Sequence, residues 1–305
     1  MPGVHRDRVK GRKKPVLSFQ RAVQLLSAAL FNGYAIGFRK GKIFTGGTKA
    51  FCVPVLNCYS CPGALGACPI GSLQAVLGGR KSGFPFYVLG TLMIFGAVLG
   101  RAVCGLLCPF GLVQDLLHKI PVPKAEAPAL IDRPARYVKY VILLAAVILL
   151  PAFAPTETGI ASPYFCKYIC PAGTLGGGIP LLLANESLRK AAGALFEWKI
   201  LLLAVIAALS AIMHRPFCKY FCPLGAFYAL FNRFSLYQMR LDGGKCVECG
   251  KCERSCPMNV DVTKNINSPE CIRCGKCKSV CPTGAISWGF ACRAEEGREA
   301  QGGGS

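Results

Sequence analysis

Residues 246–257 read CVECGKCERSCP, and residues 271–282 read CIRCGKCKSVCP. Both stretches have the spacing C-x2-C-x2-C-x3-C-P, which lets three thiolates bind one iron-sulfur cube while the fourth reaches a second cube. Zinc sites and disulfide frameworks are the alternatives, but zinc usually takes two pairs of ligands rather than two runs of four with trailing prolines. We therefore expect two [4Fe-4S] clusters near the C-terminus.

The two expected ligand sets cross between the runs. The first cluster would be bound by Cys246, Cys249, Cys252 and Cys281, and the second by Cys271, Cys274, Cys277 and Cys256. Over about residues 241–287 the two runs resemble the bacterial eight-iron ferredoxin family. This resemblance implies a small α+β domain, which we place at residues 236–290.

The rest of the chain has the composition of a membrane protein. Of its 305 residues 52% are hydrophobic and 17% are charged. Four apolar stretches are near the length of a membrane span, and two shorter ones fit re-entrant or interfacial segments. The expected spans are about 16–38, 84–103, 137–154 and 194–213, and the shorter stretches are 70–77 and 175–183. The predicted fold is an α-helical polytopic membrane domain at 16–235, with about four spans, joined to the ferredoxin domain.

The basic residues indicate an orientation. Residues 1–15 carry six Lys and Arg residues ahead of the first apolar stretch, which favours a cytoplasmic N-terminus and an uncleaved anchor. Four crossings return the ferredoxin domain to the cytoplasmic side of a prokaryotic inner membrane, although the basic loop between the first two spans does not fit this orientation. Residues 291–305 are expected to be a tail ending in a linker, with Cys292 as a spare thiol. The net charge of +21 does not indicate nucleic-acid binding, because cluster-bound thiolates would cancel much of it and no RNA-binding pattern is present.

A cysteine motif recurs through the membrane part. The pattern C-P-x-G begins at Cys68, Cys108, Cys170 and Cys222, and the last three copies have another cysteine four residues earlier. Two repeat halves follow, at about 52–118 and 158–232. The expected topology places four of these cysteines in one cytoplasmic layer, enough for a third cluster, and leaves an outer group from which four could bind a fourth. The inner set is Cys104, Cys108, Cys218 and Cys222, and the outer group is Cys58, Cys61, Cys68, Cys166 and Cys170, with Cys52 as a substitute. Buried thiols or outer disulfides are the alternatives.

The segments CGLLCPFG and CKYFCPLG, followed by a two-cluster ferredoxin domain, resemble the NapH-like family of membrane polyferredoxins over about residues 16–287. Relatives in that family include the C-terminal half of the nitrous-oxide-reductase regulator and ferredoxins associated with dehalogenases. The resemblance implies electron transfer between a cytoplasmic ferredoxin-type carrier or the quinone pool and a partner reductase. The flavin-binding outer domain and flavin-attachment motif of some relatives are missing from this sequence.

Other chemistry is weakly represented. His118 and His214 could hold a haem, but interfacial side chains are the favoured interpretation. Gln114, Asp115 and His118 lie about one turn after Cys108 and could accept protons from a quinol, or could form a solvated helix end. Two other functions stay open: an iron-sulfur reductase that itself reduces a small substrate, metal ion or partner cofactor, and a redox sensor or maturation factor. Whether the chain is itself an enzyme is left undecided.

Overall fold

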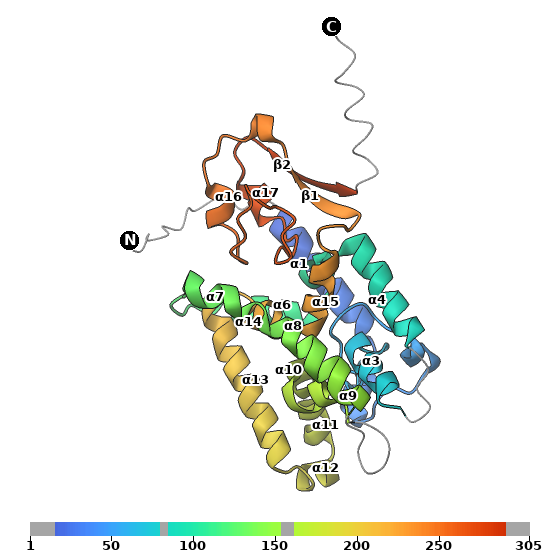
Figure 1. Ribbon diagram of the computed structural model, residues 1–305. Coiled ribbons are helices and arrows are strands. Elements are labelled where there is room, and N and C mark those ends of the chain that lie inside the picture. The colour runs from blue at the N-terminus through green and yellow to red at the C-terminus, as the bar shows by residue number, and fades with distance from the viewer. Residues whose placement is uncertain (1–15, 80–84, 154–161, 291–305) are drawn as a thin grey trace.

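A computed structural model describes residues 16–79, 85–153 and 162–290. The basic N-terminus, the tail with Cys292, and residues 84 and 154 of the expected spans lie outside this described part. It is mostly helical and ends in a small domain with a two-stranded sheet (Figure 1). The α-helices are α1 Val16–Phe31, α2 Ala35–Lys40, α3 Pro69–Leu77, α4 Phe86–Leu99, α5 Ala102–Leu106, α6 Pro109–Leu117, α7 Ala129–Ala135, α8 Val138–Ile142, α9 Leu150–Phe153, α10 Pro171–Gly173, α11 Ile179–Ala184, α12 Glu186–Lys190, α13 Ala194–Ile212, α14 Pro216–Tyr220, α15 Pro223–Phe231, α16 Lys251–Arg254 and α17 Lys276–Val280. Short π-helical segments at Leu143–Leu149, Phe165–Ile169 and Thr174–Gly178 join some of them.

Within residues 16–79, 85–153 and 162–290, two helices are long and apolar enough to cross a membrane. One runs from Leu130 to Phe153 through α7, α8 and α9, and the other is α13. They correspond to the third and fourth expected spans. The first two expected spans form the shorter helices α1, with 16 residues, and α4, with 14. Four crossings therefore remain a prediction.

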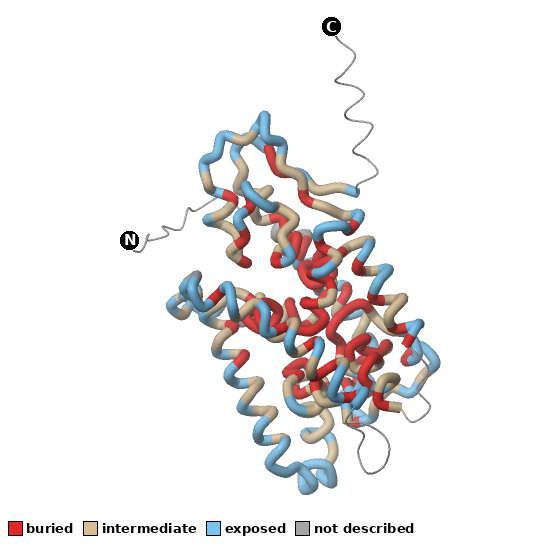
Figure 2. Tube along the Cα trace, viewed as in Figure 1, coloured by how far each residue is buried: buried red, intermediate tan, exposed pale blue. Residues whose placement is uncertain are grey.

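The helices expose apolar side chains on their outer faces. Leu26 on α1 is 62% exposed, Ile94 on α4 is 64% exposed, and Leu201 on α13 is 57% exposed. The buried residues instead gather in the middle of the molecule, where the helices meet (Figure 2). Exposed apolar faces on several neighbouring helices are the pattern expected where lipid replaces water as the solvent.

Each C-P-x-G motif starts a short helix. Cys68, Cys108, Cys170 and Cys222 are the N-cap residues of α3, α6, α10 and α15, and each has an extended backbone. The proline that follows occupies the first helical turn, where its missing N–H costs no hydrogen bond and its fixed φ suits the helix. These prolines explain why the chain turns sharply into a helix at every copy of the motif.

The small C-terminal domain packs on one end of the helical part. Strands β1 Tyr237–Leu241 and β2 Ile286–Phe290 pair antiparallel, with Met239 opposite Trp288. Gln20 and Gln24 of α1 both donate hydrogen bonds to the carbonyl of Gly105, on the helical surface that this domain contacts. An added Cβ at Gly105 would lie 2.1 Å from the carbonyl oxygen of Ile272, so only glycine permits this close contact. The N-terminal half of α1 therefore lies on the side of the small domain (Figure 1).

Candidate iron-sulfur sites

The two tail runs fold in the same way. Glu248 and Gly250 have φ of 49° and 67°, and the equivalent Arg273 and Gly275 have φ of 52° and 73°. Asn259 and Gly284, each three residues after the last cysteine of its run, also have positive φ. The first four of these left-handed residues bend the chain between successive cysteines, and Asn259 and Gly284 bend it just after each run, which aims thiols that are close in sequence toward one centre.

The crossed pairing of the two runs is visible in the side chains. A small cavity is lined by three cysteines of the first run and the last cysteine of the second, together with Pro282. The other four thiols interact electrostatically with one another across the domain. The first set is Cys246, Cys249, Cys252 and Cys281, and the second is Cys256, Cys271, Cys274 and Cys277. Both sets coincide with the expected ligand sets, and cluster binding by them remains a proposal.

A third set of four thiols lies in the helical part, beside the small domain. Each of its members is buried, and each interacts electrostatically with others of the set. The backbone N–H of Gly225 also donates to Cys222 Sγ at 3.3 Å. We call this the inner quartet, and it consists of Cys104, Cys108, Cys218 and Cys222.

A fourth set of thiols lies deeper in the helical part. It contains four of the six cysteines that the sequence offered as candidates for the outer group. Cys170 interacts electrostatically with three other thiols, and an added Cβ at Gly173 would meet the sulfurs of both Cys58 and Cys170. Cys61 has electrostatic contact with Cys58 and Lys49, whereas Cys52 forms a hydrogen bond with Ser72. We call this set the outer quartet, and it consists of Cys58, Cys68, Cys166 and Cys170.

The thiol sets fit a cube better than a single ion. Within residues 16–79, 85–153 and 162–290, no three His, Cys, Asp or Glu side chains converge closely enough to hold one metal ion. In a four-iron cube each iron takes a separate cysteine, so the four sulfurs surround a body larger than one ion. Sets of four separate thiols match that requirement, and in the inner quartet all four are buried.

Two buried glutamines make the same contacts in the two helical quartets. Gln114 Nε2 donates to Cys218 Sγ at 3.1 Å, and its Oε1 accepts from the N–H of Phe217 at 3.2 Å. Gln74 Nε2 donates to Cys166 Sγ at 3.4 Å, and its Oε1 accepts from Phe165 N at 3.0 Å. Sequence reasoning placed Gln114 at a candidate proton-transfer site or solvated helix end, but it is buried against a thiol. Sequence reasoning missed Gln74, although the shared spacing C-P-x-G-x-x-Q could have identified both.

The two helical quartets are neighbours. Tyr228 is fully buried between them, within electrostatic range of Cys68 on one side and of Cys104, Cys108 and Cys222 on the other. Its hydroxyl donates to the carbonyl of Pro54 at 2.8 Å. The same loop places the N–H of Leu56 against Cys108, two residues before Cys58. This inward loop brings the outer quartet close to the inner one.

A buried ion-pair network joins the inner quartet to the small domain. Arg101 Nη1 lies 2.8 Å from Glu270 Oε2, and Lys139 Nζ lies 2.5 Å from Glu270 Oε1. Arg101 also donates to the carbonyl of Cys218 at 3.1 Å, while Glu270 directly precedes Cys271. The side chain of Arg101 therefore contacts both the backbone of the inner quartet and the loop that carries the second tail set.

Comparisons with known proteins agree with this architecture. The "4Fe-4S binding domain" family matches residues 66–85, 84–128, 140–183 and 195–240, one match for each C-P-x-G copy, and the "4Fe-4S dicluster domain" family matches residues 238–282. No solved structure is significantly similar to the chain.

Three related proteins span much of the chain. The uncharacterized protein MJ0750 of Methanocaldococcus jannaschii is 30% identical over 67% of this chain and 78% of its own length. The putative electron transport protein YccM of Escherichia coli is 27% identical over 59% of this chain and 47% of its own length. The methylamine utilization ferredoxin-type protein MauN of Paracoccus denitrificans is 29% identical over 65% of this chain and 64% of its own length.

Proposed function

The chain belongs to the NapH-like family of membrane-associated polyferredoxins, which are ferredoxin-type electron-transport proteins, and from this we propose that it conducts electrons through a membrane along four [4Fe-4S] clusters. The observation that carries the proposal is the series of four cysteine sets. They follow one another from the first tail set, through the second and the inner quartet, to the outer quartet. When bound, such clusters supply one-electron transfer at potentials set by their surroundings.

The protein's own residues make the series continuous. The crossed pairing places Cys256 of the first run in the second tail set, so the two tail sets share each other's loops. Arg101 and Glu270 then link the second tail set to the inner quartet, and Tyr228 lies between the inner and outer quartets. The inward loop with Pro54 and Leu56 brings the outer quartet toward the inner one. An electron therefore does not have to cross the whole hydrocarbon core, about 30 Å thick, in a single transfer.

A membrane location is proposed from the apolar helices. Two helices have the length and composition of spans, and α1 and α4 present further apolar faces. We propose four crossings, with re-entrant segments at α3 and at Pro171–Ala184, and with the N-terminus and the ferredoxin domain on the cytoplasmic side of a prokaryotic inner membrane. In this arrangement the tail sets exchange electrons with a soluble ferredoxin-type carrier.

The outer quartet borders a large apolar cavity of about 910 Å³. Leu181, Leu182 and Phe196 line it, together with the outer cysteines, Lys49 and Lys199. A volume of this size with apolar walls and a few polar groups suits an organic ligand. We propose that the quinone pool or a group on a partner reductase meets the outer quartet here.

Measurement of iron and acid-labile sulfide per chain tests the proposal directly. Protein purified anaerobically in detergent is expected to contain about sixteen irons, with four redox-titratable signals by electron paramagnetic resonance. A content of about eight irons would confine the clusters to the ferredoxin domain and would overturn a route through the membrane. Electron transfer from a reduced soluble ferredoxin to a quinone analogue in proteoliposomes would then test the proposed end points.

A further inference from the structure

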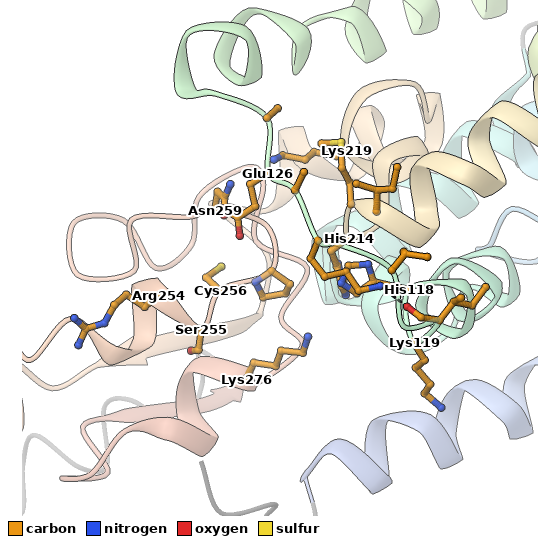
Figure 3. A pocket seen from close by; sticks show the side chains of 18 of the residues that line it. His118, Lys119, Glu126, His214, Lys219, Arg254, Ser255, Cys256, Asn259 and Lys276 are labelled. Atoms are coloured by element: carbon orange, nitrogen blue, oxygen red, sulfur yellow. Dashed lines mark hydrogen bonds between the residues drawn. The ribbon is translucent and has the colours of Figure 1, made fainter. Parts of the chain in front are cut away.

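A second large cavity lies where the ferredoxin domain meets the helical part. Its volume is about 760 Å³. Figure 3 shows Cys256 and Lys276 on the ferredoxin side and His118 and His214 across from them. Several lining residues, including Lys119 and Arg254, are exposed, so the cavity is open to water. The cavity is separate from the apolar one beside the outer quartet.

Positive charge dominates the lining. Five of the lining side chains are lysine or arginine, and one, Glu126, is acidic. Lys219 is paired with Asp132, and Lys124 donates to two backbone carbonyls. Within the described residues the side-chain ammonium groups of Lys119 and Lys276 have no hydrogen bond or ion pair; Lys119 belongs to the helical side of the cavity and Lys276 to the ferredoxin side (Figure 3). Flexible lysine side chains on both sides of one water-filled space attract a multiply charged anion such as a phosphate.

The cavity also has unsatisfied hydrogen-bonding groups. His214 Nδ1 and Asn259 Oδ1 are buried and have no hydrogen-bond partner in the described part of the chain. Both residues line the cavity. Buried polar atoms without partners are rare in folded proteins and often indicate an unseen ligand or water. The imidazoles of His118 and His214 pack edge to face, with ring centroids 5.4 Å apart, and both line this cavity.

One wall of the cavity is part of the second tail set. Cys256 and Pro257 line it directly, and Cys256 is one of the four cysteines proposed to bind the second cluster. A ligand in this position would therefore lie beside an electron carrier that accepts one electron at a time. Among phosphate-bearing organic cofactors, flavins exchange single electrons, whereas nicotinamides transfer hydride.

We propose that this cavity binds a phosphate-bearing, redox-active nucleotide of the flavin mononucleotide class. Its ring would lie against Cys256 and Pro257, and its phosphate would lie between Lys119 and Lys276. The volume of about 760 Å³ falls within the range of about 300–1,000 Å³ that is usual for small-molecule sites. The inference rests on the proposed function, because it gives the electron-transfer series a small-molecule partner at the cytoplasmic end.

Binding of flavin mononucleotide to the cluster-containing protein, with inorganic phosphate and adenosine monophosphate as comparison ligands, tests the proposal. We expect one flavin per chain by calorimetry, quenching of the flavin fluorescence on binding, and competition by millimolar phosphate. Adenosine monophosphate is expected to bind at least tenfold more weakly, because it lacks the three-ring flavin system that would contact Cys256 and Pro257. Equal affinities for the two nucleotides would overturn the assignment to a redox-active ligand.

Charge variants locate the site. K119Q together with K276Q is expected to weaken flavin binding at least tenfold, while K264Q, an exposed lysine of the same domain outside the cavity, should change it less than twofold. No binding, or binding that is unaffected by the double variant, would overturn the proposal. Iron content is measured on every sample, so a protein with four clusters and no flavin binding would refute this inference and leave the proposed function standing.

Discussion

Cys58 and Cys61 are three residues apart, and the sequence pattern does not show which of them is a ligand in the outer quartet. The structure places Cys58 with Cys68, Cys166 and Cys170, and leaves Cys61 next to Cys58 and Lys49. C58S is therefore expected to lower the iron content by about four atoms per chain and to remove one paramagnetic signal. The measurement is iron and sulfide analysis of anaerobically purified protein.

C61S is the matched control, because Cys61 lies three residues after Cys58 in the same loop and its thiol is at least as well buried. It should retain about sixteen irons. If C61S loses four irons and C58S keeps them, the assignment of the outer quartet is wrong.

Gln114 is expected to raise the reduction potential of a cluster in the inner quartet. Its N–H donates to Cys218 Sγ, and such a bond stabilises the more negative, reduced state. In Q114L this bond is lost, so the potential should fall. A difference of about 1 kcal/mol between the two oxidation states corresponds to roughly 40 mV for one electron. Redox titration followed by electron paramagnetic resonance measures the shift.

Q74L provides the comparison for Q114L. Gln74 makes the equivalent contact with Cys166, so this variant should lower the potential of a different signal by a similar amount. Each variant also leaves a backbone N–H of Phe217 or Phe165 without its acceptor, at a cost of roughly 1–3 kcal/mol of stability. Loss of stability with no change in either potential would show that the glutamines only support the fold.

At the scale of helices and loops, Glu270 holds the ferredoxin domain on the helical part. E270Q would leave Arg101 and Lys139 buried without a negative partner. Removing one member of a buried ion pair typically costs about 3–5 kcal/mol. We expect a lower unfolding temperature, faster proteolysis between α15 and β1, and slower electron transfer from the tail clusters to the inner quartet.

E186Q tests whether any lost ion pair has this effect. Glu186 pairs with Lys190 on α12, where both side chains are mostly exposed, and such a pair contributes little. This variant should behave like the unmodified protein. Equal stabilities for E270Q and the unmodified protein would mean that the buried network does not join the two parts.

The corner between α6 and α14 is expected to lose stability in mild acid. Burial lowers the pKa of His214 to about 4, with Lys276 and Arg215 acting in the same direction and Asp115 opposing them. The ring of His118 packs edge to face against that of His214, and the pKa of His118 is also lowered by burial and by Lys124. The unfolded chain therefore binds more protons than the folded one between pH 6.5 and 4, so stability falls as the pH falls through this window.

For His214 alone the loss is about 2 kcal/mol by pH 5. Hydrogen bonds from Arg215 and His214 overcome burial and hold the pKa of Asp115 well below its usual range, so its contribution is lost only in stronger acid. Thermal unfolding of the protein and of H214Q between pH 7 and 5 measures the difference. A parallel decline in both proteins would rule out His214 as the cause.

The repeated cysteine motifs explain which of the cysteine sets could be predicted from the sequence. The spacing C-x2-C-x2-C-x3-C-P was enough to predict the crossed tail sets, whereas the inner quartet was predicted from two C-x3-C-P pairs together with the expected topology. The outer quartet was not resolved, since its fourth thiol, Cys58, comes from a loop with no regular spacing. Gln74, Tyr228 and Glu270 were missed because their roles depend on contacts between segments that are far apart in the chain.

For the whole molecule, the arrangement of the helices predicts which ends face the cytoplasm. The N-terminal half of α1 lies beside the ferredoxin domain, whereas the turn between α12 and α13 lies at the opposite end (Figure 1). If the helices cross the membrane as proposed, a protease site inserted at Ala192 should be cut from outside in right-side-out vesicles. The same site inserted at Ala125, in the loop after α6, should be cut only in inverted vesicles.

Both insertion points are exposed, so insertion should not disturb the core. Iron content, measured on each variant, verifies that the fold is kept. Cleavage of both sites from the same face would rule out a transmembrane α13, and with it a route that ends on the far side. The exposed apolar surfaces of α1, α4 and α13 would then have to be covered by another protein, because water would not tolerate them on this scale.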